Sequence, residues 1–296
     1  MAKVFAGSET KPGVTTLVKL NYDVSTAQSV GQRDCQEDAI VSHFAQGSDF
    51  GFVVLADGMG GHAAGDIASK IVVTEVFSEL MFQSGDISAL QSQMGPSLRE
   101  AANSANLCLA GYVATNPATK GMGATLVGLV IVGQSLWWIS IGDSPLFLFR
   151  DGKLRQLNED HSLAPQIDFL AAQGQIDIET ARKHPDRNVL TSVLFGDKVA
   201  RIDCPPEPIC LIDGDIVIVA SDGLQFLDEF QITTCLQGDS AIMARTLLNN
   251  VMVLDDPDQD NVTFCVIRVH LAEQALSDKS PAWRRHKTQP LVGVSL

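Results

Sequence analysis

The stretch VVLADGMGGHAAGDIASK, residues 53–70, joins an apolar run to a segment with helical character. The run that ends at Asp57 is rich in valine and leucine, which is typical of a buried strand. The DGMGG sequence that follows could be a phosphate-binding loop, part of a metal site, or a tight turn between a strand and a helix. As a phosphate loop it is a weak signal, because it lacks both the GK[ST] ending and the GxGxxG spacing.

Strand-like runs recur along the chain on both sides of this stretch. Most are rich in valine, isoleucine, phenylalanine and tryptophan, and turn residues separate them. The sequence LFLFRDGKLRQL predicts a hairpin with its turn at Asp151-Gly152. The predicted strands cover residues 16–26, 49–57, 124–132, 135–143, 145–152, 215–223 and 262–271.

Three segments have apolar residues at helical spacing. Residues 62–82 and 87–114 lie between the second and third predicted strands, and Gly95-Pro96 could break the latter near its start. Residues 240–254 predict a third helix. Two sheets packed together, with helices on the outside, would satisfy this order of elements.

Composition narrows the class of protein. The 296 residues carry a formal net charge of −14, which argues against nucleic-acid or anionic-membrane binding. The six cysteines form no CxxC pair, so we expect reduced thiols in a cytoplasmic protein. The N-terminus has no signal-peptide pattern. Residues 121–142 are long enough for a membrane span, but their glycines and a GQS break favour two buried strands.

Two regions stand apart from the regular pattern. Residues 161–195 lack a clear strand period, and a long, weakly structured insertion of this kind is often a functional flap. We expect a flexible arm over residues 1–14, one folded domain over 15–271, and a flexible basic tail over 272–296. The Arg284-Arg285 pair of that tail could form a docking site, although a solvated tail is the simpler interpretation.

Acidic residues recur where the apolar strands end or begin. A single strand-end Asp-Gly is usually only a turn. For the whole set this explanation is weaker, because carboxylates gathered at neighbouring strand ends repel one another unless cations lie between them. Oxygen ligands without paired histidine or cysteine favour Mg²⁺, Mn²⁺ or Ca²⁺. The set consists of Glu37, Asp38, Asp57, Asp143, Asp222 and Asp260.

Two further residues complete a set suited to metal-assisted hydrolysis of a phosphomonoester. Arg33 lies four positions before Glu37, and its guanidinium could bind a phosphate through two nitrogens. His62 could protonate a leaving oxygen. Simpler roles stay open for both, since Arg33 could pair with a neighbouring acid and His62 could cap the following helix.

Seven blocks of the sequence, taken in order, resemble the metal-dependent PPM (PP2C-type) serine/threonine protein phosphatases. Together they cover roughly residues 20–270. They are GQRDCQEDA (31–39), VVLADGMGGHAAGDIAS (53–69), GMGATLV (121–127), SIGDSPLFLFRDGKLRQLNEDHS (140–162), HPDRNVLTSVLFG (184–196), LIDGDIVIVASDGL (211–224) and DQDNVTFCVIRV (258–269).

The resemblance implies a fold and a pair of core metal ions. The fold is α+β, a four-layer α/β/β/α sandwich of two antiparallel sheets flanked by helix pairs. The ions are Mn²⁺ or Mg²⁺ and lie at one edge of the sandwich. Asp57 would bridge them, Glu37 and the carbonyl of Gly58 would serve one, and Asp222 and Asp260 would serve the other.

Further roles follow from the same resemblance. Asp38 would reach a metal through water, and Asp143, with Asp222, matches the pair that holds a third, weaker ion in bacterial-type members. Arg33 matches the phosphate-binding arginine and His62 the proposed general acid. A metal-bound hydroxide would attack phosphorus without a covalent intermediate.

The chain also departs from the family pattern. Pro145 stands where the family often has the arginine of GDSR, and Ser192 stands where it often has the arginine of LTRALG. Neither position is a core ligand. Asn261 follows Asp260 as in the family's DN pair, and residues 161–190 match the flap that helps select substrates.

We therefore expect a phosphoric monoester hydrolase of bacterial, stand-alone type that acts on phosphoserine and phosphothreonine in proteins. Its partners would be phosphorylated proteins, and it would oppose a serine/threonine kinase in signal transduction. We expect a monomer with neither a membrane span nor bound nucleic acid. Two alternatives are a non-catalytic, metal-dependent regulator that binds phosphoproteins, and a metal-dependent nuclease or phosphodiesterase, with which the acidic charge conflicts.

Overall fold

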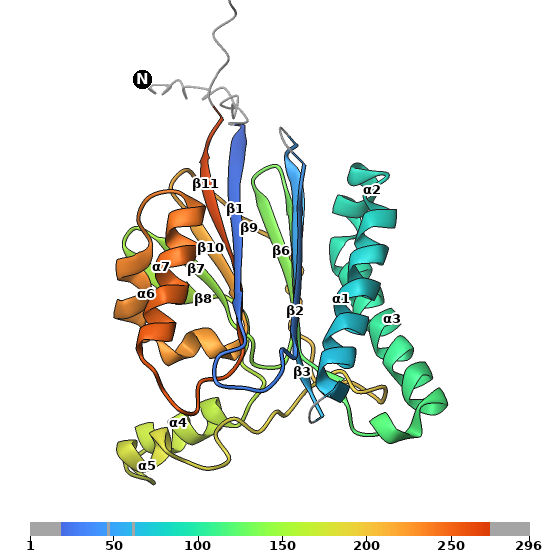
Figure 1. Ribbon diagram of the computed structural model, residues 1–296. Coiled ribbons are helices and arrows are strands. Elements are labelled where there is room, and N and C mark those ends of the chain that lie inside the picture. The colour runs from blue at the N-terminus through green and yellow to red at the C-terminus, as the bar shows by residue number, and fades with distance from the viewer. Residues whose placement is uncertain (1–18, 46–47, 61–62, 273–296) are drawn as a thin grey trace, which may run out of the picture.

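The computed structural model describes residues 19–45, 48–60 and 63–272. They form four layers, with two antiparallel sheets face to face and helices covering each outer face (Figure 1). This confirms the fold class expected from the sequence. The predicted arm at 1–14 and all but the first residue of the predicted tail lie outside the described residues.

Both sheets are built from antiparallel pairs of strands. The first has the order β1 (Leu20–Ser29), β11 (Val262–Leu271), β10 (Ile216–Ala220), β7 (Leu146–Arg150) and β8 (Lys153–Gln156). The second has the order β2 (Asp38–Phe44), β3 (Phe50–Met59), β5 (Leu126–Val132), β6 (Ser135–Ile141) and β9 (Ile209–Cys210), and the short β4 (Gly123–Ala124) pairs with β3.

The helices divide between the two outer faces (Figure 1). The second sheet is covered by α1 (Ala63–Gln83), α2 (Ile87–Ser92) and α3 (Met94–Thr115), and the first by α6 (Glu229–Cys235) and α7 (Ser240–Val253). Two more, α4 (Ala164–Ala172) and α5 (Ile178–Arg182), lie toward one end of the sandwich (Figure 1), and η1 (Pro117–Thr119) and η2 (Asp222–Phe226) are 3₁₀ turns.

Three apolar layers hold these four layers together. The middle one joins the sheets through residues such as Leu55, Leu129 and Ile267, each of which is fully buried. The outer ones join each sheet to its helices. A strand such as β3 is therefore covered on both faces, which explains its almost continuous apolar sequence.

Most predicted elements are present, and the differences have local causes. The break between α2 and α3 falls at Gln93, so Gly95 and Pro96 lie in the first turn of α3, where the missing N–H of proline is harmless. Residues 161–195, which the sequence predicts to be weakly structured, contain α4 and α5. The apolar window at 121–142 is β4, β5 and β6, and no helix among the described residues is long and apolar enough to span a membrane.

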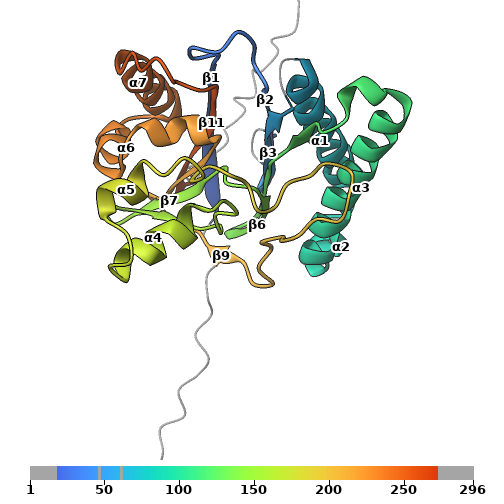
Figure 2. The ribbon, with the colours of Figure 1, turned by 90° about the horizontal axis from the view of Figure 1, so that it is seen from below.

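The strand register brings the acidic strand ends to one end of the sandwich. In one sheet Ser29 pairs with Val262, next to the end of β10. In the other, Asp38 pairs with Asp57, and Leu126 pairs with Ile141. Figure 2 looks at the molecule from this end, with α4 and α5 on one side and the start of α1 on the other.

Candidate active site

A cavity of about 640 Å³ opens at this end of the sandwich. The residues that line it come from β3 and its sheet, from the segments after β10 and before β11, from the loop between β1 and β2, and from the segment that precedes β9. Eight residues singled out from the sequence are among them: Arg33, Glu37, Asp57, Gly58, Asp143, Asp222, Asp260 and Asn261.

The opening stretch of sequence forms a close junction between β3 and α1. The backbone N–H of Gly58 donates to the Glu37 carbonyl at 3.1 Å. A Cβ at Gly58 would lie 2.0 Å from the Gly65 carbonyl oxygen, and one at Gly65 would lie 2.5 Å from Oε1 of Glu37. Both glycines therefore let the start of α1 approach the acidic strand end, and the first three residues of DGMGG, Asp57 to Met59, belong to β3.

Asn261 fixes the loop that carries Arg33 and Glu37. Its Oδ1 accepts a hydrogen bond from the Glu37 N–H at 2.7 Å, and its Nδ2 donates to the carbonyls of Val30 and Cys35 at 2.9 and 3.0 Å. Because Asn261 is only 4% exposed, these bonds are shielded from water and hold the loop against the start of β11.

Arg33 pairs with one of the acids, as its simpler interpretation allows. Its Nη2 lies 2.7 Å from Oδ2 of Asp260, and Oδ1 of Asp260 accepts from the Asn261 N–H at 2.7 Å. The Arg33 side chain is 56% exposed. Its guanidinium can therefore turn toward the cavity without giving up buried packing contacts.

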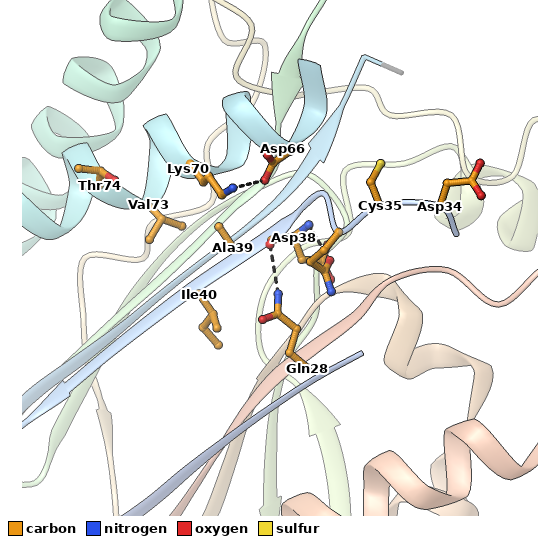
Figure 3. Close-up of a pocket in the computed structure, with 11 residues that line it drawn as sticks. Gln28, Asp34, Cys35, Asp38, Ala39, Ile40, Asp66, Lys70, Val73 and Thr74 are labelled. Carbon is orange, nitrogen blue, oxygen red and sulfur yellow. Dashed lines mark hydrogen bonds and ion pairs between the residues drawn. The ribbon is translucent and has the colours of Figure 1, made fainter. Parts of the chain in front are cut away.

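Asp38 lies beside the main cavity and lines a neighbouring one, between α1 and the loop before β2 (Figure 3). Its Oδ2 accepts from the Ser221 hydroxyl at 2.8 Å, and its carbonyl accepts from Nε2 of Gln28 at 3.2 Å. Ser221 also accepts from the Thr263 N–H at 3.0 Å. Ser221 thus links the acid to the first sheet, a role that its sequence position does not suggest.

The acids change one another's protonation. Burial raises the pKa of Asp57 well above its ordinary value, and the nearby acids raise it further. Burial likewise raises the pKa of Asp38 and of Asp143 to about 7 each, and that of Asp222 to about 6, with nearby carboxylates adding to each shift. Ionised together, these groups would need compensating positive charge.

The donor set fits hard divalent cations in chemistry. All donors are oxygens, and among the described residues Oδ1 of Asp38 and Oδ1 of Asp222 are buried without a hydrogen-bond partner. As the side chains stand, no three His, Cys, Asp or Glu residues of the described chain are spaced to hold an ion. Asp260, held by Arg33, is one side chain that would have to turn before it could ligate.

The flap is anchored directly beside these acids. The His161 N–H donates to the Gly142 carbonyl at 3.0 Å, and the Thr191 N–H donates to the His161 carbonyl at 2.7 Å. Asn188 and Val189, from the far end of the flap, line the main cavity. Sequence reasoning identified the segment but not these contacts, because long-range pairing leaves no periodic pattern.

Thr125 contributes to the site although the sequence analysis did not single it out. Thr125 Oγ1 accepts from the Asp57 N–H at 2.9 Å and shares a hydrogen bond with Ser144 at 2.8 Å. Thr125 therefore positions the end of β3, a role that no sequence motif indicates. His62, the predicted proton donor, lies outside the described residues.

The two departures from the family pattern have structural roles. Ser192 is 3% exposed, and its Oγ donates to the Arg201 carbonyl at 2.7 Å and accepts from the Arg201 N–H at 2.9 Å. It thereby ties the end of the flap to the segment that follows it. The Pro145 carbonyl accepts from the Ala220 N–H at 3.0 Å, which aligns the chain before β7 with β10.

The sequence profile of the protein phosphatase 2C family matches residues 27–253. The chain belongs to this family. The protein phosphatase PhpP of Streptococcus pneumoniae is 30% identical over 259 residues, which cover 84% of this chain and 98% of PhpP. Family membership confirms the expected enzyme class, a metal-dependent phosphoprotein phosphatase.

A second relative is also known from a solved structure. The serine/threonine protein phosphatase PstP of Mycobacterium tuberculosis is 32% identical over 224 residues, and the match covers 73% of this chain but 40% of PstP. A crystal structure of the PstP catalytic domain in complex with two manganese ions has a TM-score of 0.64 and 28% identity, with 86% of this chain and 99% of that one covered.

Proposed function

We propose that this chain hydrolyses phosphoserine and phosphothreonine in proteins at the cavity lined by Arg33 and the acidic strand ends. The observation that carries this proposal is the gathering of partly buried carboxylates with raised pKa values in one open cavity. Such a cluster is fully ionised at neutral pH only with compensating cations, and the family to which the chain belongs is metal-dependent.

The proposed ligands are the carboxylates of Glu37, Asp57, Asp222 and Asp260 with the carbonyl of Gly58. Asp38 would act through water, and Asp143 would join Asp222 in a third site. Bound Mn²⁺ or Mg²⁺ would supply an activated water and neutralise charge on the phosphoryl group. The hydrogen bonds that Thr125 and Asn261 accept support this assignment, because they hold the backbone of two proposed ligands in place.

Arg33 is the proposed phosphate-binding residue. In the structure, Arg33 neutralises the carboxylate of Asp260. A metal ion at Asp260 would neutralise that carboxylate instead and free the guanidinium for phosphate. Arg33 would thus orient the phosphoryl group toward the acidic cluster. We assign His62 the role of proton donor to the departing serine or threonine oxygen, on its sequence position alone.

Phosphate release from a phosphothreonine peptide with Mn²⁺ tests this function. We expect turnover that excess EDTA abolishes and that Asp57→Asn lowers by at least about a hundredfold, since a carboxylate that would hold the ions is removed. Unchanged turnover in either condition would overturn the proposal. Protein that binds Mn²⁺ and peptide without releasing phosphate would favour a non-catalytic phosphoprotein-binding regulator.

For His62→Ala we expect a slower chemical step with Mn²⁺ binding retained, because a proton donor acts on the leaving group rather than on the ion. Loss of Mn²⁺ binding would instead assign the residue a structural role. A phosphodiester assayed beside the phosphomonoester separates the proposed activity from that of a nuclease.

A further inference from the structure

A second cavity, of about 390 Å³, adjoins the candidate active site. The two cavities share Asp143, Asn188 and Asp222 in their walls, so the second continues from the acidic cluster. Its outer wall is the flap, including the C-terminal end of α5. A polypeptide whose phosphorylated residue lies at the acidic cluster would therefore pass close to this cavity.

The flap contributes two arginines to a wall of this cavity, in a chain with a net charge of −14. Arg187 is already neutralised, because its Nη1 and Nη2 donate to Oδ1 and Oδ2 of Asp168 in α4 at 2.6 and 2.8 Å. This paired geometry fixes the segment after α5 against α4. Arg187 is therefore better suited to shaping the cavity than to binding a ligand.

Arg182 differs from Arg187 in having no ion pair with any residue that the structure describes. It is the last residue of α5, and its side chain is exposed at the cavity. The next residue, Lys183, has a partner in Glu179 at 3.6 Å and lines a different hollow, with Thr180. Arg182 thus differs from Lys183 in the cavity that it lines and in its ion pairing, while the two share the same charge.

The acids of this cavity do not remove its affinity for an anion. Asp143 and Asp222 belong to the proposed metal cluster, where bound cations would offset their charge. Asp160 keeps its negative charge: its Oδ1 accepts from the Ser162 N–H at 2.8 Å, and the carboxylate acts on nearby Arg187, whose pKa it helps to raise. Arg182, which forms no ion pair with a described residue although it helps to lower the pKa of nearby Asp168, is then the cation that an incoming side chain meets at the outer wall.

We propose that this second cavity binds an acidic or phosphorylated side chain of the substrate, and that Arg182 selects it. The proposal rests on the phosphatase function proposed above. An extended chain advances about 3.3–3.6 Å per residue, and the two cavities share wall residues, so the selected side chain would lie only a few residues from the one that is dephosphorylated. Carboxylate and phosphate share the chemistry that a guanidinium recognises.

The test compares phosphothreonine peptides that differ only in aspartate or asparagine at one position within three residues of the phosphothreonine. A parallel set carries phosphoserine at that position. We expect kcat/KM of the full chain to be about fivefold or more higher for the acidic peptide at a preferred position, with the preference falling as salt is added.

Arg182→Ala should abolish this preference while leaving kcat/KM for the asparagine peptide within about twofold of the wild-type value, because only the contact to the anion is lost. Lys183→Ala is the matched control, a neighbouring exposed cation outside the cavity, and should keep the preference. A preference confined to phosphoserine peptides and lost in Arg182→Ala would also support the proposal, with phosphate as the anion.

Equal turnover of acidic and neutral peptides at every position would overturn the proposal and leave the phosphatase function standing. So would a preference that survives Arg182→Ala. Absence of turnover for every peptide would instead overturn the phosphatase function itself, on which this inference depends.

Discussion

Replacement of Asp38 by asparagine should stabilise the metal-free protein at neutral pH. The side chain is 3% exposed, and burial, with smaller effects from Asp222 and Asp260, raises its pKa from 3.8 to about 7. The folded state therefore holds a proton that the unfolded state releases. The stability contributed by this group is present below pH 4 and is lost as the pH rises toward 7.

The size of the effect follows from the two pKa values. A difference of about three units corresponds to about 4 kcal/mol at pH 7.5, at 1.36 kcal/mol per unit. The neighbouring carboxylates can share the proton, so we expect about half of this, roughly 2 kcal/mol, as the gain in the free energy of unfolding for Asp38→Asn. At pH 4 the gain should shrink to within about 0.5 kcal/mol.

Urea denaturation in EDTA, at pH 4 and at pH 7.5, measures both values. Asp186→Asn is the control, since Asp186 is exposed and should change the free energy of unfolding little at either pH. A variant no more stable than the wild type at pH 7.5, or one equally stabilised at both pH values, would refute the argument that the buried carboxylate is destabilising without a cation.

Two further substitutions test how the strand ends are positioned. Ser221→Ala removes the hydroxyl that bonds to Asp38 and leaves the Thr263 N–H buried without its partner. Thermal unfolding should therefore show that the free energy of unfolding falls by about 1–3 kcal/mol. An unchanged free energy of unfolding would contradict this role of Ser221. Gly58→Ala places a Cβ 2.0 Å from the Gly65 carbonyl oxygen, so we expect about 1–3 kcal/mol of destabilisation. A variant with wild-type stability would show that α1 can move away without cost.

Much of the sandwich follows from local pattern. Strands such as β3 and β5 are apolar throughout because they are covered on both faces, and the Asp151-Gly152 turn is marked by two residues that adopt positive φ, 52° and 76°. The strand β2 (Asp38–Phe44) was not among the predicted runs. It is an edge strand with only partly buried side chains beyond Asp38, so its sequence carries a weaker pattern.

The candidate site likewise has features that local sequence pattern predicts and features that it does not. Aspartates at the ends of apolar strands could be picked out, because they interrupt a strong pattern at one position. The Arg33–Asp260 pair, the Ser221 bond to Asp38 and the anchoring of the flap join residues 227, 183 and 30 positions apart in sequence. Such contacts depend on how the sheets pack against each other, which no local pattern encodes.

The central claim is that the carboxylates at the end of the sandwich form a divalent-cation site. Calorimetric titration of the metal-free protein with Mn²⁺ at pH 6.5, in two buffers with different ionisation enthalpies, tests it most directly. We predict that Mn²⁺ binds with protons released, because the raised pKa values leave several acids protonated. Asp57→Asn should lose most of this binding. Absence of Mn²⁺ binding, or equal binding by Asp57→Asn, would contradict the claim.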